Sequence, residues 1–383
     1  MSSWWPIVSL VVIVALILAA EHQTALHRLF KWLPIPLWCY ALPMLGVTFG
    51  WLPGAHPAYR TLTELLLPFA LALLLLGVDF PAVIRSGKRA LLAAILGAVG
   101  VVAGAAFSVW GLHTQLSAEA WKGAGALAGT WTGGTMNLLA LRLILEMPDT
   151  IFAPLVVVDA LFAYSWMALL VAASGFQRPI NEWLRAIETV PPSARNLASQ
   201  QSLSQAGNVV VCGVVAVGLA VGSRMLGSHL PISHFISSAT GWTVLLVTTA
   251  ALSCSLIPSV RRFGSQGARL GYPSLYLVLA ATGAQGSFEA LRQAPVWFLV
   301  GFGVVISHGL LLLAAGRFWR IPLGILATAS QANIGGLVSA PLVGAVYEQS
   351  LAPVGLLLAM AGNALGTYLG WSAAVICRWL LQP

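Results

Sequence analysis

The stretch Gly129-Thr130-Trp131-Thr132-Gly133-Gly134-Thr135-Met136-Asn137 lies inside a run of residues that is otherwise apolar enough to cross a lipid bilayer. A second stretch, Gln331-Ala332-Asn333-Ile334-Gly335-Gly336-Leu337-Val338-Ser339, has the same character in the other half of the chain. Glycine pairs weaken a helix and expose its backbone. Inside a bilayer such backbone is tolerated only where protein or a water-filled cavity supplies hydrogen-bond partners. Interrupted apolar segments at matching places in two halves indicate a transporter binding site.

The composition places the whole chain in a membrane. Of its 383 residues, 58% are hydrophobic and 8% are charged, with a mean hydropathy of +0.87. Soluble domains carry about 25% charged residues. Many runs approach the roughly 20 apolar residues that a spanning helix needs, and they do not alternate as barrel strands do. The net charge of +8 resides at the ends of these runs. We interpret it as retention of Lys and Arg in cytoplasmic loops, and expect no nucleic-acid partner.

The apolar runs repeat. The two Gly-Gly pairs are 202 positions apart, and shifting the runs of the first half by this distance places them near those of the second half. We predict a first membrane repeat at 1–174, a polar linker at 175–206 and a second membrane repeat at 207–383. A short amphipathic piece of the linker, 180–187, is expected on the membrane surface.

The basic clusters suggest that the repeats are inverted. The densest clusters follow the third run of the first half and the second run of the second half, and both should be cytoplasmic. One cluster follows an odd-numbered run of its half, and the other follows an even-numbered run. If both clusters are cytoplasmic, the two repeats cross the membrane in opposite directions. Inversion requires an odd number of crossings between equivalent points. Either one element of each half is re-entrant, or the linker adds a crossing.

Asp159 is the acidic residue that lies in the middle of an apolar run, Val156 to Phe162. A carboxylate at the centre of a membrane helix costs about 2.5–3.5 kcal/mol on insertion scales and usually marks an ion or proton path. It would bind Na⁺ as a carboxylate, or carry a proton if burial raises its pKa. The alternative is a neutral, hydrogen-bonded acid that holds two helices together.

The two interrupted stretches supply the remaining candidates. Hydroxyl, amide and freed carbonyl oxygens suit a hard cation, and the N-termini of half-helices favour an anionic group. The alternative is close helix packing on small residues. The predicted substrate-binding residues are Thr130, Thr132, Gly133, Gly134, Thr135, Asn137, Asn333, Gly335, Gly336 and Ser339. The predicted coupling-ion residues are Asp159, Gln331, Asn363 and Thr367, with Na⁺ or H⁺ as the ion and Na⁺ at Asp159 as the candidate metal.

Other polar residues in apolar runs are weaker candidates for a functional role. His308 would relay protons, or be satisfied by a backbone carbonyl, and the second reading is favoured. Arg142 would meet an anionic substrate, or extend to the interface, and again the second is favoured. The four cysteines are scattered singly, and we expect neither a disulfide framework nor a cofactor. No nucleotide loop, GxSxG or HExxH pattern occurs.

The paired motifs resemble a known family. Residues 129–137 are similar to the G-S/T-x-T-G-G-S/T-x-N segment of the domain-of-unknown-function 819 family of bacterial and plant membrane proteins. Residues 332–336 are similar to its A-N-V-G-G-P segment, 364–370 to its closing helix and 73–79 to its L-L-L-F-x-x-D stretch. Asp159 matches an acidic position after the first motif. Leu337 departs from the pattern, because the family usually has proline there.

The resemblance carries further implications. The family is grouped with the cation/proton antiporter and anion transporter superfamily, which includes bile-acid-type and glutamate sodium symporters. It implies an all-α membrane protein of two inverted repeats with crossing, discontinuous helices, a core domain that moves against a scaffold, and often a homodimer. We expect a multi-pass protein of a bacterial inner membrane, in contact with membrane lipid and a small-molecule substrate.

Two functions remain at this point. The first is a secondary active transporter of a small anionic or zwitterionic organic solute, coupled to Na⁺ or H⁺, which is not an enzyme. The alternative is a membrane-embedded enzyme acting on a lipid-linked substrate, for which His308 with Asp159 is the pair available. A closed site at the midplane favours transport, and a lateral opening to lipid favours the enzyme.

Overall fold

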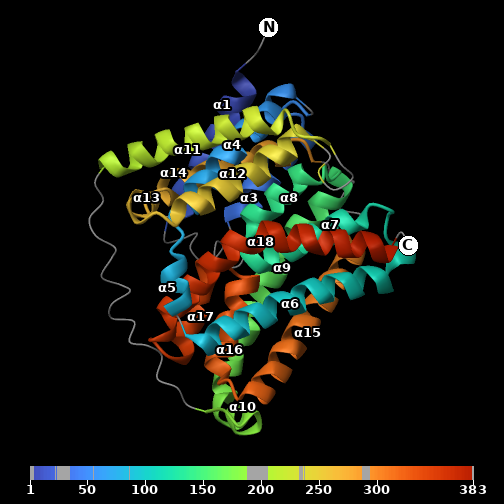
Figure 1. Ribbon diagram of the computed structural model, residues 1–383. Helices are drawn as coiled ribbons and strands as arrows, with labels where there is room; N and C mark the ends of the chain where they lie inside the picture. The colour runs from blue at the N-terminus through green and yellow to red at the C-terminus, as the bar shows by residue number, and fades with distance from the viewer. Residues whose placement is uncertain are drawn as a thin grey trace. The chain divides into compact units, whose positions relative to one another are not determined.

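The computed structural model describes residues 4–21, 23, 35–54, 56–85, 87–187, 206–232, 236, 238–286 and 294–381. The elements of these ranges are helices (Figure 1), which confirms the prediction of an all-α membrane protein. The second part of the predicted linker, 188–205, lies outside the described residues. Its first part contains the 3₁₀ turn η2 (Ser174–Phe176) and the amphipathic helix α10 (Gln177–Leu184), which follow directly on the preceding helix.

The first half of the chain begins with three helices and a short one: α1 (Trp5–Glu21), α3 (Ile35–Thr48), α4 (Pro57–Leu75) and α5 (Phe80–Arg85). It continues with α6 (Lys88–Gly111), the turn η1 (His113–Gln115), α7 (Ala120–Gly133), α8 (Thr135–Ile144) and α9 (Asp149–Ala173). Proline residues inside α3, α4 and α9 are accommodated without ending the helix. Packing against neighbouring helices in a membrane allows this.

The second half has a matching order. It consists of α11 (Ala206–Gly227), α12 (Ala239–Ser255), α13 (Pro258–Gly264), α14 (Ala268–Gly283), α15 (Ala294–Trp319), α16 (Leu323–Ile334), α17 (Ser339–Tyr347) and α18 (Leu351–Leu381). Helices α9 and α18 begin at residues that are 202 positions apart, the spacing of the two Gly-Gly pairs. A duplicated chain predicts such a correspondence.

Within the described ranges, six helical segments are long and apolar enough to cross a membrane: Pro57–Leu75, Lys88–Gly111, Asp149–Leu184, Asn208–Gly227, Ala294–Trp319 and Leu351–Leu381. Counting α12 and α13 as one span, bent by 113°, gives up to seven. Three shorter apolar helices, α1, α3 and α8, accompany them. The protein is therefore a multi-pass integral membrane protein, and several apolar runs of the sequence are shorter or broken elements.

The helices form two compact units that do not coincide with the two halves of the sequence. Unit 1 comprises residues 1–77, 142–160 and 205–297, and unit 2 comprises residues 78–141, 161–204 and 298–383. Each unit takes segments from both halves: α1, α3 and α4 join α11 to α14 in unit 1, whereas α5 to α7 join α16 to α18 in unit 2. In unit 1, α14 packs on α3 and α4. In unit 2, α7 packs on α18, and α16 packs on both α6 and α18.

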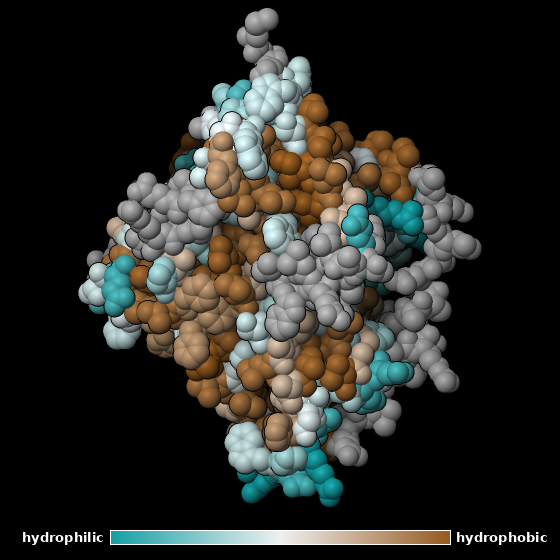
Figure 2. Space-filling model, turned by 180° about the vertical axis from the view of Figure 1, so that it is seen from behind, coloured by the Kyte–Doolittle hydropathy of each residue, from teal (hydrophilic) through white to brown (hydrophobic). Residues whose placement is uncertain are grey.

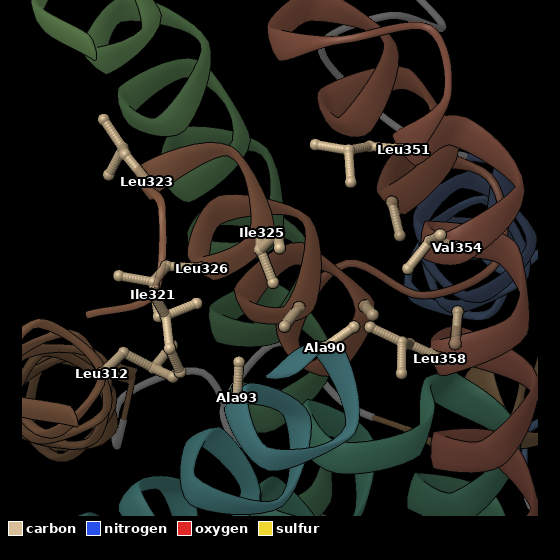
Figure 3. Packing of buried hydrophobic residues seen from close by; sticks show 14 of the residues in the cluster. Ala90, Ala93, Leu312, Ile321, Leu323, Ile325, Leu326, Leu351, Val354 and Leu358 are labelled. Carbon is tan, nitrogen blue, oxygen red and sulfur yellow. The ribbon is translucent and has the colours of Figure 1, made fainter. Parts of the chain in front are cut away.

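The core of unit 2 surrounds α16. Figure 3 shows Ile325 and Leu326 of this helix among Ala90 and Ala93 of α6 and Val354 and Leu358 of α18. All twelve residues of α16 are buried. Since a helix that is buried all round has no lipid-facing side, α16 lies inside the bundle and not at its surface.

The contact between α7 and α18 uses glycine on both sides. Gly125, Gly129 and Gly133 recur at intervals of four residues on α7, and Gly362, Gly366 and Gly370 do the same on α18. A Cβ atom added at Gly133 would lie 2.2 Å from the carbonyl oxygen of Gly362, and one at Gly362 would lie 2.3 Å from that of Thr132. Small residues in this spacing let membrane helices approach backbone to backbone.

Candidate functional site: two interrupted helices

The first interruption separates α7 from α8. Helix α7 ends at Gly133, Gly134 has φ 84° and ψ 172°, and α8 begins at Thr135. This backbone conformation is one that glycine adopts and other residues rarely do. The N–H of Gly134 still donates to the carbonyl of Thr130 at 2.5 Å. The helical hydrogen-bond ladder therefore closes at Gly134, and the chain restarts in a new helix one residue later.

The second interruption separates α16 from α17. Helix α16 ends at Ile334, Gly336 has φ 81°, and α17 begins at Ser339. The N–H groups of Gly335 and Gly336 both donate to the carbonyl of Gln331, at 2.8 and 3.0 Å. Gly134 and Gly336 are again 202 positions apart, so the positive φ recurs at equivalent places. The prediction that both stretches interrupt a helix is confirmed, and both lie in unit 2, where α7 contacts α16.

Asn137 joins the first interruption to α18. Its side chain is fully buried, and its Nδ2 donates to the carbonyl of Gly133 at 2.7 Å and more weakly to that of Asn363 at 3.5 Å. Its Oδ1 accepts a hydrogen bond from the Thr367 hydroxyl at 2.6 Å. Asn137 and Thr367 therefore satisfy each other and are structural supports of the interruption. Asn363 is half-buried, and its Oδ1 lies beside Gly134.

The other polar residues of the first stretch differ in accessibility. The hydroxyl of Thr132 donates to Ala128 of its own helix at 2.8 Å, and Thr130 and Thr132 are buried. Gly133 is buried against α18. Gly134 and Thr135 are half-buried and present the start of α8. In this conformation Gly134 and Thr135 are thus the members of the predicted substrate set that this stretch leaves accessible.

Gln331 is the unusual residue of the second interruption. Its Nε2 donates to Ser339 Oγ at 2.9 Å across the break, whereas its Oε1 is buried and has no hydrogen-bond partner among the described residues. A buried polar atom without a partner costs about 1–3 kcal/mol. Gly335 is packed against this pair, since an added Cβ would lie 1.8 Å from Gln331 Nε2. Gly335 and Ser339 are half-buried, and Gly336 is buried.

Freed backbone oxygens follow Gln331 in the chain. The last carbonyls of a helix have no partner in the helix itself. In the described chain, no main-chain N–H bonds to the carbonyls of Ala332, Asn333 and Ile334, because Gly335 and Gly336 both use Gln331. The side chain of Asn333 is turned to α6, where its Nδ2 donates to Ala94 at 3.1 Å.

A second polar cluster of unit 2 surrounds His308 of α15. His308 is fully buried, its Nδ1 lies 2.8 Å from the carbonyl of Gly97, and its Nε2 lies 2.8 Å from Ser330 Oγ. Since a carbonyl only accepts, Nδ1 carries a proton, and in the neutral ring Nε2 accepts from Ser330. Ser330 in turn accepts from Trp166 Nε1–H at 2.8 Å. The favoured interpretation of His308 as a carbonyl-bonded residue is confirmed, while Ser330 and Trp166 were missed by the sequence analysis.

The signal that could have found this cluster is weak. Ser330 precedes Gln331 and belongs to the same polar end of α16. Trp166 lies near the middle of a long apolar run and not at its end, where tryptophans of an interfacial belt are expected. A tryptophan at that depth needs a hydrogen-bond acceptor for its N–H, and this requirement predicts a polar neighbour without identifying it.

The remaining predicted residues lie elsewhere. Asp159 is half-buried on α9, in the part of that helix that belongs to unit 1. The predicted coupling-ion set is thus distributed over the first interruption (Asn363 and Thr367), the second interruption (Gln331) and unit 1. Arg142, for which extension to the interface was the favoured interpretation, pairs through its guanidinium Nη2 with Asp149 Oδ1 at 2.5 Å and packs over the Phe152 ring, with 13% of the side chain exposed.

Comparison with known proteins gives two findings. The family model described as "Protein of unknown function (DUF819)" matches residues 8–380. A protein of Bacillus subtilis (strain 168) named "Uncharacterized membrane protein YjcL" is 26% identical over 373 residues, which cover 92% of this chain and 93% of the relative. Both matches extend over nearly the full chain and include both interruptions.

Proposed function

Because this chain belongs to the DUF819 family, whose function is unknown, its own site has to indicate what it does, and we propose that it is a secondary active transporter. The substrate would be a small anionic or zwitterionic organic solute, and the coupling ion Na⁺ or H⁺. We also propose that the protein lies in a bacterial inner membrane, where such gradients exist, and that it forms a homodimer. It would catalyse no chemical reaction.

The observation that supports this proposal most is the recurrence of one backbone geometry. Two helices of the same unit are interrupted at a positive-φ glycine, at equivalent positions of the two halves. Neither stretch contains a charged side chain. The N-termini of α8 and α17 would therefore supply the positive potential that attracts an anionic group. The half-buried residues at these termini, Thr135 and Ser339, are the hydroxyls we propose as first substrate contacts.

Na⁺ is the ion that the second interruption suits. Gln331 Oε1 is an oxygen without a partner, and the carbonyls of Ala332, Asn333 and Ile334 lie in the same turn of chain. Neutral oxygens of this kind, with unwound carbonyls, coordinate Na⁺ in transporters built on broken helices. Asp159 remains the candidate for H⁺, because it is a carboxylate in the middle of the apolar helix α9.

The two contact units suggest how the site would alternate between the two sides of the membrane. Unit 2 carries both interruptions, and unit 1 carries neither. Each unit contains segments from both halves of the chain. We therefore propose unit 2 as the moving core and unit 1 as the scaffold, with alternating access by motion of one against the other.

The enzyme alternative has less support in the site. His308, the base that it requires, is fully buried with both ring nitrogens in hydrogen bonds. A general base must come within hydrogen-bond reach of the proton that it takes. His308 would have to leave Gly97 or Ser330 to do so, and Asp159 belongs to the other contact unit. We therefore propose transport and not catalysis.

Transport is tested in two steps with the purified full chain. A thermal-shift screen with small carboxylates and zwitterions, with and without NaCl at constant ionic strength, identifies a ligand that stabilises the folded state. Uptake of the radiolabelled hit into proteoliposomes is then measured under imposed Na⁺ and proton gradients. Accumulation that follows one gradient supports the proposal. Conversion of the hit to a product, or equilibration that ignores both gradients, would contradict it.

The Na⁺ site gives a separate prediction for Gln331→Leu. This change removes the unpartnered Oε1 at similar volume, together with the hydrogen bond from Nε2 to Ser339 Oγ. Without Na⁺ the melting temperature should therefore change little, because the loss of an unpaired buried oxygen offsets the loss of the hydrogen bond. The rise in melting temperature that NaCl gives the wild-type protein, relative to choline chloride, should disappear. Differential scanning fluorimetry in detergent measures both quantities.

Two further variants make this test specific. Gln285→Leu, in unit 1, is the matched control, since Gln285 Nε2 donates to the carbonyl of Ala281, four residues earlier in the chain, at 2.9 Å. It should keep the full Na⁺ response. Asp159→Asn should also keep it if Gln331 holds the ion. A Na⁺ response that survives Gln331→Leu and is lost in Asp159→Asn would move the site to Asp159.

A further inference from the structure

One end of unit 2 gathers positive charge. It is built from the start of α6, the amphipathic helix α10, the end of α15 and the start of α16 (Figure 1). Hydrogen bonds connect these elements: Ile187 N–H donates to the Arg320 carbonyl at 3.1 Å. The Arg89 guanidinium donates to the Ile187 carbonyl at 3.1 Å, and Asn181 Oδ1 accepts from Leu323 N–H at 2.8 Å. Figure 2 shows hydrophilic residues gathered at this lower end.

The charge balance of this end is strongly positive. Its basic residues are Lys88, Arg89, Arg178, Arg185, Arg317 and Arg320. Within the segments 88–89, 177–187 and 317–323, the acidic residue is Glu182, which pairs with Arg178 at 3.4 Å in an exposed position. Positive charge at the end of a membrane span faces the cytoplasm. There it meets the anionic lipids of the inner leaflet, which attract each nearby Lys or Arg by about 1 kcal/mol.

An apolar groove opens beside these arginines. It has a volume of about 530 Å³ and is lined by Trp183 of α10 and by Leu310, Leu313, Ala314, Arg317 and Phe318 of α15. This volume lies within the range of about 300–1,000 Å³ that is common for ligand sites. The lining is apolar except for Arg317, and Trp183 and Phe318 are exposed.

The position of the groove defines the kind of molecule that fits. It follows the last turns of α15, a membrane span, and is flanked by a helix with one apolar and one polar face. Such a helix lies in the interfacial plane of a bilayer, with Trp near the headgroups. An occupant therefore has its apolar part in the hydrocarbon and its polar part at Arg317 and Arg320. A free phosphate ion would use the arginines and leave the apolar wall empty.

We propose that this groove binds an anionic phospholipid, with an acyl chain along Leu310 and Leu313 and the phosphate headgroup at Arg317 and Arg320. The site is separate from the interrupted helices, and it does not depend on the transport proposal. A bound lipid would contact both α10 and α15 at the membrane surface. It would therefore stabilise this end of unit 2.

The test measures lipid retained by the purified full chain. Protein is equilibrated in detergent micelles with equal amounts of phosphatidylglycerol and phosphatidylcholine that carry the same acyl chains, and bound lipid is counted by native mass spectrometry. The wild-type protein should retain phosphatidylglycerol preferentially. Arg317→Gln and Arg320→Gln should each lower that preference about fivefold. Arg224→Gln is the matched control, because Arg224 also lies in the last turn of a spanning helix, α11, and should leave retention unchanged.

A groove-filling variant separates a lipid site from general surface attraction. Ala314→Trp keeps every charge and occupies the groove, so it should also lose the retained phosphatidylglycerol. Equal loss in Arg224→Gln and Arg317→Gln, or full retention in Ala314→Trp, would overturn the proposal. Displacement of the lipid by inorganic phosphate at constant ionic strength would identify a simple anion site and would equally overturn it.

Discussion

Replacing Asn137 by Ala is expected to destabilise unit 2 strongly and to abolish substrate binding. The variant leaves the Thr367 hydroxyl and the Gly133 carbonyl without the buried partners that Asn137 gives them at 2.6 and 2.7 Å. Each unsatisfied buried group costs about 1–3 kcal/mol, so the loss from the two groups should be about 2–6 kcal/mol. The start of α8 would also lose its attachment to α18. The melting temperature in detergent and the ligand-induced thermal shift measure the two effects.

The partner residue supplies the control for Asn137. Thr367→Val removes the donor at similar volume and leaves Asn137 Oδ1 unpaired, so it should cost less than Asn137→Ala. The double variant should cost less than the sum of the two single variants, because both remove the same hydrogen bond. Additive losses of stability would mean that the two side chains do not interact in the folded protein.

The second large effect is expected at Gly362. A Cβ there would lie 2.3 Å from the backbone carbonyl oxygen of Thr132, a separation that real side chains do not reach. Gly362→Ala must therefore push α18 away from α7, since a backbone carbonyl cannot turn aside as a side chain does. Overpacking costs about 1–3 kcal/mol, and we expect the upper end of that range. A lower melting temperature and a lower yield of monodisperse protein after size-exclusion chromatography are the readouts.

Gly218→Ala is the matched control for this variant. Gly218 lies inside α11, and an added Cβ would meet nothing within 4 Å. Since alanine favours a helix over glycine by about 1 kcal/mol, this change should be neutral or slightly stabilising. If Gly362→Ala is as stable as Gly218→Ala, α7 and α18 do not pack backbone to backbone.

The sequence predicts the two interruptions well because they depend on local chemistry. A Gly-Gly pair in an apolar run has few alternatives in a membrane, and Gly134 and Gly336 take the positive φ that only glycine adopts readily. The close contact of α7 and α18 was also present as glycines at intervals of four residues. The glycine spacing alone does not identify this contact, because the sequence does not say which two of the many apolar runs meet.

The direction of each polar side chain is less predictable. Thr132 and Asn333 lie within the predicted stretches, yet Thr132 donates to its own helix and Asn333 donates to α6. A serine or threonine in a helix readily satisfies its hydroxyl on a carbonyl of the preceding turn. Asn333 finds a partner 239 positions away, and such a pairing follows from the arrangement of helices and not from local pattern.

The division into units shows the same limit. The spacing of 202 positions predicts two halves in sequence, whereas contacts group the early helices of both halves in unit 1 and the later ones in unit 2. Hydrophobic periodicity identifies helices but does not say which of them associate. In a chain with 58% hydrophobic residues, nearly every helix has an apolar face to offer.

The glycine-on-glycine contact between α7 and α18 has a mechanical consequence. Where two main chains touch directly, no side chains lie between them. One helix therefore cannot slide along the other by a change of side-chain rotamers. Helices α7 and α18 therefore move together as one rigid pair. Any displacement of the first interruption must drag the last helix of the chain along with it.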